Sequence, residues 1–97
     1  RTAMSMSAMS TVAITACSKT LAALGVTVPE NLARVTLFPA SGTVNWNLGT
    51  ASAATNTVPP GGFDFPMDTN MAGKLKFFSA AGATLDVYFT TTAGWLG

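Results

Sequence analysis

The chain is 97 residues long, and 48% of its residues are hydrophobic while only 9% are charged, far below the roughly 25% charged share of an ordinary soluble domain. Its net charge of +1 is spread without a run of either sign, which argues against the clustered cations that give nucleic-acid-binding proteins their affinity. A surface so short of charge does little to oppose association. We therefore expect a protein that contacts partner proteins over much of its surface and binds no nucleic acid.

Residues 1–10 alternate methionine with serine and alanine and contain no glycine or proline. We interpret this segment as an extended N-terminal arm that adds a strand to the sheet edge of a neighbouring chain, with a frayed terminus as the alternative. Met4, Met6 and Met9 are then candidate interface residues. The segment lacks the continuous apolar run of a signal peptide, and no stretch of the chain reaches the roughly 18 to 20 apolar residues that span a bilayer, so we expect no membrane partner.

From Thr11 onward, apolar and polar residues alternate in short runs, a pattern typical of β-strands. The first runs are 11–15 and 26–28, and the segment 20–25 between them is predicted to be either one helical turn or an irregular corner. The runs 34–38 and 43–47 follow. Because the residues between these two runs are Pro-Ala-Ser-Gly, which have strong turn chemistry, we expect the two runs to form a β-hairpin.

The middle of the chain is dominated by small polar residues and turn residues. Residues 48–58 are predicted to be a polar loop, and Pro59-Pro-Gly-Gly62 is predicted to be a tight turn, because proline fixes φ while glycine permits a positive φ. A short strand over 63–65 follows. Pro66 is expected to end it.

The last third of the chain contains the clearest strand patterns. In the run 74–78, Leu75 and Phe77 share one face, and both lysines share the other. In the run 84–91 the odd-numbered apolar residues are predicted to point inward, with Asp86 and Tyr88 pointing outward. Six to eight short strands without a convincing helix predict an all-β fold, namely a small antiparallel β-sandwich or a jelly-roll-like barrel. We divide the chain into the arm (1–10) and one β-sandwich domain (11–97).

Few side chains in this sequence are suited to catalysis or to metal binding. The chain has no histidine, the commonest general base and metal ligand. Asp64 and Asp68 are the one acidic pair close in sequence. They suggest either a glycosidase-like pair or calcium ligands, although Pro66 between them favours a simple loop, and a small hydrolase that also uses Asp86 is a remote alternative. We expect no enzyme activity, no cofactor and no metal. Cys17 is the only cysteine and is predicted to be a buried, inert thiol.

The aromatic residues fall into two groups. Those on inward positions of the predicted strands are expected to be core residues: Trp46, Phe63, Phe65, Phe77 and Phe89. The others fall out of register with the buried faces or lie near the C-terminus, and we predict that they are interface anchors: Phe38, Phe78, Tyr88 and Trp95. For Trp95, folding back onto its own sheet is an equal alternative.

The stretch from Thr11 to Thr91 resembles a group of small virion proteins of tailed bacteriophages. The resemblance lies in the order of several short motifs rather than in any one of them. The motifs are Val-Ala-Ile-Thr (12–15), Thr-Leu-Ala-Ala-Leu (20–24), Val-Pro (28–29), Arg-Val-Thr-Leu (34–37), Val-Asn-Trp (44–46), Gly-Thr (49–50), Ala-Thr (54–55), Pro-Gly-Gly-Phe-Asp-Phe (60–65), Lys-Leu-Lys-Phe-Phe (74–78) and Ala-Thr-Leu-Asp-Val-Tyr-Phe (83–89).

This resemblance implies a small β-sandwich structural protein, such as a capsid decoration (cement) protein or a head–tail accessory protein, and it brings no catalytic residues. The expected function is to bind the outer surface of the major capsid protein lattice and stabilise the head. The expected partners are the major capsid protein and further copies of the chain in a dimer or trimer. The expected location is the capsid exterior of the virion. The alternative is a tail or fibre accessory module that recognises a host surface glycan through Trp95, Tyr88 or Trp46.

Overall fold

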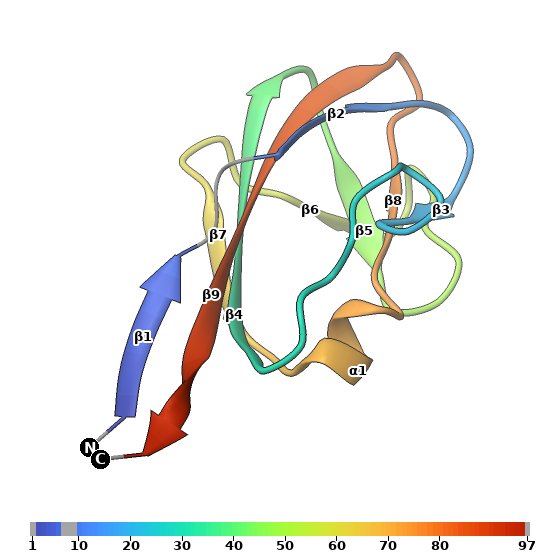
Figure 1. Ribbon diagram of the computed structural model, residues 1–97. Coiled ribbons are helices and arrows are strands. Elements are labelled where there is room, and N and C mark those ends of the chain that lie inside the picture. Colours follow the sequence, from blue (N-terminus) through green and yellow to red (C-terminus); the bar gives the residue numbers. More distant parts are fainter. Residues whose placement is uncertain (1, 7–9, 97) are drawn as a thin grey trace.

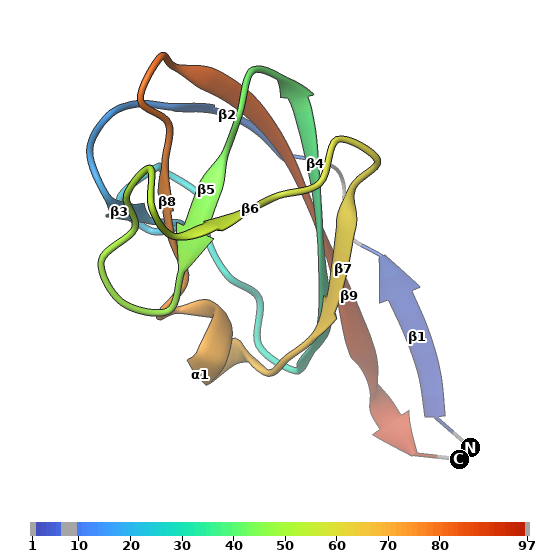
Figure 2. The same cartoon turned by 180° about the vertical axis from the view of Figure 1, so that it is seen from behind.

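The structure is a computed structural model that describes the backbone of residues 2–6 and 10–96 and the side chains of residues 10–91. It confirms the predicted all-β class. Within the described residues, nine strands form two antiparallel sheets that pack face to face as a small β-sandwich (Figures 1 and 2). The two sheets remain separate, so the fold is a sandwich rather than a closed barrel. The strands outnumber the predicted six to eight partly because two of them are only two residues long.

The larger sheet, called here the large sheet, is organised around β9 (Ala83–Leu96), the longest strand. On one side of β9 lies β4 (Leu32–Ser41), and β7 (Phe63–Pro66) pairs with the far side of β4. On the other side, β1 (Thr2–Met6) and β2 (Ser10–Ile14) follow each other along β9. The start of the chain therefore runs antiparallel to its end along nearly the whole length of β9.

The smaller sheet, called here the small sheet, has the order β3-β8-β5-β6. Its strands are short: β3 (Lys19–Thr20), β8 (Lys76–Phe78), β5 (Asn45–Asn47) and β6 (Asn56–Thr57). β6 lies within the segment that we predicted to be a polar loop. It pairs with the edge of β5 through only two residues.

The predicted hairpin between 34–38 and 43–47 is wrong. β4 remains in the large sheet with β7 and β9, whereas β5 pairs with β8 and β6 in the small sheet. Gly42 lies where the chain crosses between the sheets, with a φ of +73°, and a Cβ built there would lie 2.7 Å from the carbonyl oxygen of Gly82. Because only glycine permits so close an approach in this conformation, residues that suggest a hairpin turn instead form a corner between two sheets.

The core lies between the sheets, and in the last third of the chain it follows the predicted alternation. The predicted strand over 26–28 is wrong, because the structure describes these residues and has no strand there, although Val26 is buried. In β9 the inward residues Leu85, Val87 and Phe89 are buried, and Phe77 of β8 faces them fully buried from the small sheet. Burying a side chain of this size contributes roughly 1.5–3 kcal/mol. The corner at 20–25 contains a helical turn, because the amide of Leu24 donates to the carbonyl of Thr20 at 3.0 Å.

One short helix, α1 (Thr69–Ala72), was not predicted from the sequence. Asp68 caps its N-terminus, and its carboxylate accepts a hydrogen bond from the amide of Met71 at 2.8 Å. The hydroxyl of Thr69 donates to the carbonyl of Pro29 at 2.8 Å and accepts from the amide of Leu32. This single turn thus ties the segment after β7 to the beginning of β4. No helix in the described residues is long and apolar enough to cross a membrane.

Candidate assembly surfaces

The outer face of the large sheet carries two of the predicted interface aromatics. In the register of β4 and β9, Thr36 lies opposite Tyr88 and Phe38 lies opposite Asp86, so Phe38 and Tyr88 are diagonal neighbours on one face. Phe38 is 43% exposed and Tyr88 is half-buried. Their predicted outward orientation is therefore confirmed. We call this surface the threonine–aromatic face and define it by Thr11, Thr36, Phe38, Asp64, Asp86 and Tyr88.

Phe38 also has a contact within its own sheet. A Cβ built on Gly62, just before β7, would lie 3.1 Å from Cδ2 of Phe38, which means that the phenyl ring rests against the glycine backbone. An aromatic ring that covers a glycine in a neighbouring strand is a known way to stabilise a sheet edge. Because this contact leaves 43% of the residue exposed, Phe38 remains available to a partner.

The charges on the threonine–aromatic face are paired or hydrogen-bonded. Arg34 and Asp64 form an ion pair at 3.0 Å, and the hydroxyl of Thr36 donates to the same carboxylate at 3.2 Å. The hydroxyl of Thr11 donates to Asp86 at 2.8 Å. An exposed ion pair contributes only about 0–1 kcal/mol to stability. With Arg34, Asp64 and Asp86 the face carries a net charge of −1, located on Asp86, among hydroxyl groups and aromatic rings.

A two-stranded ribbon projects from the sandwich (Figures 1 and 2). The pairing between β4 and β9 ends at Leu32 and Thr91, whereas β1 pairs with β9 as far as Leu96. In the described part of the chain, β1 is therefore the one strand that pairs with residues 92–96. β9 has 14 residues, which span about 46 Å at roughly 3.3 Å each. This length agrees with the 47 Å long axis of the molecule.

The remaining predicted interface residues lie elsewhere. Phe78 is half-buried on the outer side of the small sheet, opposite Asn45 in the register, and so does not join the threonine–aromatic face. Met4, Met6 and Trp95 lie in the ribbon strands, where the structure describes the backbone but not the side chains. Met9 lies outside the described residues. The predicted contact roles of these residues remain predictions.

A cluster of three aromatic rings lies at one open side of the sandwich. Trp46 of β5 contacts Phe63 and Phe65 of β7 edge-on, with ring centroids 6.0 Å and 4.9 Å apart. All three residues pack against the core as predicted, but they are only half-buried. The sequence indicated their inward orientation. It did not reveal that the neighbouring strands β6 and β7 are sheet edges, which leaves the rings partly uncovered.

The carboxylates and the thiol are dispersed. Asp64 pairs with Arg34, whereas Asp68 caps α1, so the two carboxylates serve separate contacts. Among the described residues, no group of three or more potential metal ligands comes together. The prediction of a buried thiol is wrong, because Cys17 is exposed. It lies in the bend where the chain leaves β2 of the large sheet for β3 of the small sheet, and the core does not extend there.

Comparisons with known proteins leave the family of this chain open: no family model, no curated protein and no solved structure matches it.

Proposed function

We propose that this chain is a structural subunit of a bacteriophage virion, a decoration protein that binds the outer surface of the major capsid protein lattice and stabilises the head. The mechanism is adhesion. The ribbon pairs with a strand edge of a neighbouring chain, and the threonine–aromatic face rests on the capsid surface. Symmetric copies, as dimers or trimers, then multiply weak contacts into firm attachment.

The observation that carries this proposal is the chemistry of the ribbon. β1 is an edge strand of the large sheet, and its sequence, Thr-Ala-Met-Ser-Met, contains no charge and no proline. Residues 92–96 of β9 are equally free of charge and proline. Natural proteins usually protect sheet edges with lysine, proline or a bulge because an open edge recruits other strands. The β1–β9 pairing has one register irregularity, between Thr2 and Met4, and from Met4 to Met6 it is regular. An isolated two-stranded ribbon is also marginally stable, so pairing with a third strand stabilises this one.

The threonine–aromatic face supports the same function. An aromatic side chain buries much area at an interface for a small loss of entropy, and Phe38 and Tyr88 are diagonal neighbours in the register of β4 and β9. The low overall charge agrees with a subunit that is surrounded by other protein. The motif order between Thr11 and Thr91 resembles that of small phage virion proteins, which supports a phage particle as the assembly. A tail or fibre accessory module is the alternative within the same class.

A co-sedimentation experiment tests this function. The purified chain is mixed with shells assembled from the major capsid protein of the same virus, and the amount that pellets with the shells is measured over a concentration series. Phe38→Asp places a charge on the threonine–aromatic face. Leu48→Asp is the matched control, because Leu48 is also 43% exposed but lies outside that face. Urea unfolding of each variant verifies that it is folded at the assay temperature.

We expect the wild-type chain and the Leu48→Asp variant to bind shells equally. The Phe38→Asp variant is expected to bind at least about tenfold more weakly, as for a buried aromatic anchor. If the wild-type chain does not bind the shells at any concentration, the decoration function is wrong. If Phe38→Asp binds like wild type while folded, the capsid contact does not involve the threonine–aromatic face.

A further inference from the structure

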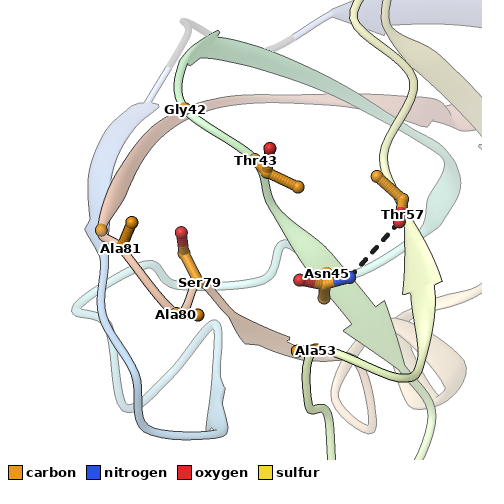
Figure 3. Close-up of a pocket in the computed structure, with 9 residues that line it drawn as sticks. Gly42, Thr43, Asn45, Ala53, Thr57, Ser79, Ala80 and Ala81 are labelled. Carbon is orange, nitrogen blue, oxygen red and sulfur yellow. Dashed lines mark hydrogen bonds between the residues drawn. The ribbon is translucent and has the colours of Figure 1, made fainter.

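A pocket of about 450 Å³ lies at the end of the sandwich where the chain crosses between the two sheets (Figure 3). Its walls are the corner at Gly42 and Thr43, the turn from Ser79 to Gly82, one side chain each of β5 and β6, and Ala53 in the loop between those strands. This volume lies within the roughly 300–1,000 Å³ range of small-molecule sites. None of its residues belongs to a strand of the large sheet.

The walls of the pocket are held in place by contacts behind them. The Gly42 corner lies against the turn at Gly82, since a Cβ built on Gly42 would lie only 2.7 Å from the Gly82 carbonyl oxygen. The side-chain amide of Asn45 donates to the hydroxyl of Thr57 at 3.3 Å and to the carbonyl of Thr55 at 3.4 Å. Thr55 is fixed in turn by two hydrogen bonds with Ser52. These contacts therefore hold the walls of the pocket in place in the ligand-free chain.

Two polar side chains, both more than nine-tenths buried, have unused hydrogen-bonding groups in this pocket. Asn45 is 5% exposed and Ser79 is 1% exposed. The amide nitrogen of Asn45 points to Thr57, and its oxygen points the other way, toward the Ser79 side of the pocket (Figure 3). No described residue hydrogen-bonds to Asn45 Oδ1 or to Ser79 Oγ. Among the described residues Trp46 Nε1 is the one fully buried side-chain polar atom without a partner, so both of these oxygens are open to solvent through the pocket. A ligand that fills the pocket must therefore supply hydrogen bonds to both oxygens, because shielding them from water without a partner is costly.

The chemistry of the lining defines the class of ligand. All nine lining residues are glycine, alanine, serine, threonine or asparagine, so no charge is available for a phosphate, a carboxylate or an amine. Asn45 Oδ1 accepts hydrogen bonds, whereas the hydroxyls of Ser79, Thr43 and Thr57 both donate and accept. Ala80 and Ala81 lie beside Ser79, and Ala53 lies at the other end of β5, so the lining also offers methyl groups (Figure 3). A ligand that matches must be neutral and compact, with hydroxyls that also donate and accept and with C–H surface between them.

The geometry points to this pocket as a binding site for one neutral, pyranose-sized sugar unit. The site goes beyond the proposed adhesion to the capsid and lies away from the threonine–aromatic face, so a subunit attached through that face would keep the pocket free. The predicted glycan contacts at Tyr88 and Trp46 are not part of it, since neither residue lines the pocket. The pocket is accessible in the isolated chain, so its test does not depend on the capsid.

The test is a titration of the isotope-labelled chain with the methyl glycosides of glucose, galactose, mannose and N-acetylglucosamine, followed by amide NMR. Ser79→Ala removes one unpartnered hydroxyl and leaves the backbone bonds of that residue in place. Ala81→Leu fills the pocket from an exposed position. Its matched control is Ala22→Leu, which adds the same side chain at an exposed alanine of the 20–25 corner, outside the pocket.

We expect at least one glycoside to shift the amides of residues 79–82 in a saturable way. Ser79→Ala should weaken binding about two- to tenfold, which is the loss of affinity expected for one hydrogen bond. Ala81→Leu should abolish binding, and Ala22→Leu should leave the affinity unchanged. The proposal is overturned if none of the four sugars shifts these amides, if Ala81→Leu binds as well as wild type, or if methyl glucuronide, a charged analogue, binds more tightly than the neutral sugars. Shifts at these amides that arise only from self-association also overturn it.

Discussion

Replacing Gly42 by alanine tests the corner that carries the chain from the large sheet to the small sheet. Gly25 provides a matched control, because both glycines have a positive φ, +73° at Gly42 and +87° at Gly25. Alanine in this region of φ costs about 1–2 kcal/mol at either position. At Gly25 the new Cβ has no neighbour within 4 Å, so the strain of the positive φ accounts for the whole loss of folding free energy.

At Gly42 a steric cost is added. The Cβ would lie 2.7 Å from the carbonyl oxygen of Gly82 and 2.9 Å from the Cβ of Ala83, and neither atom can rotate away because one is backbone and the other is fixed to it. One of the two turns must therefore shift. Overpacking of this kind typically costs about 1–3 kcal/mol. The expected destabilisation is about 1–2 kcal/mol for Gly25→Ala and about 2–5 kcal/mol for Gly42→Ala.

Urea unfolding followed by tryptophan fluorescence measures both values. A chain of this size is expected to have an m-value of about 1 kcal/mol/M, so the midpoints of the two variants should differ by roughly 1–3 M. If both variants lose the same free energy within about 0.5 kcal/mol, the Gly42 corner does not lie against the turn at Gly82. The crossing between sheets, and with it one wall of the pocket, would then be wrong.

Three further predictions concern the core, the helix cap and the thiol. Phe77→Ala should lower the free energy of unfolding by about 3–5 kcal/mol, because Phe77 is fully buried between the sheets; a loss below 1 kcal/mol in urea unfolding would contradict this placement. Asp68→Ala should lower the free energy of unfolding by about 1 kcal/mol and Asp68→Asn by much less, because asparagine also caps helices. Equal losses for the two variants would show that Asp68 does not stabilise the protein through the helix cap. Cys17 should react completely with Ellman's reagent in native buffer; a thiol that reacts only after denaturation would show that it is buried.

The strands of the last third of the chain could be predicted from the sequence because a single local pattern determines them. From 84 to 89 every odd-numbered residue is apolar, and these residues, Leu85, Val87 and Phe89, are buried in β9. The inward positions of Leu75 and Phe77 follow from the same period of two. The outward orientation of Phe38 and Tyr88 follows too, because a residue that is out of phase with a buried face must lie on the other one.

The sequence pattern could not predict which strands share a sheet or which distant turns come together. Pro39-Ala-Ser-Gly42 has the turn chemistry of a hairpin, but the choice between hairpin and corner depends on the approach of Gly82, which is 40 positions after Gly42 in the sequence. The pocket depends on the same approach and was missed for that reason. α1 was missed because a single helical turn has too few residues to show a periodic pattern, although Asp68 before it is a typical N-cap residue.

Direct imaging of the virus particle by electron cryomicroscopy is the most direct measurement of the assembly role. We expect density for this β-sandwich on the outside of the capsid, with the ribbon of β1 and β9 against a strand of a neighbouring chain and the threonine–aromatic face toward the lattice. A particle that carries the chain on its tail, or that lacks it altogether, would contradict the proposed decoration function.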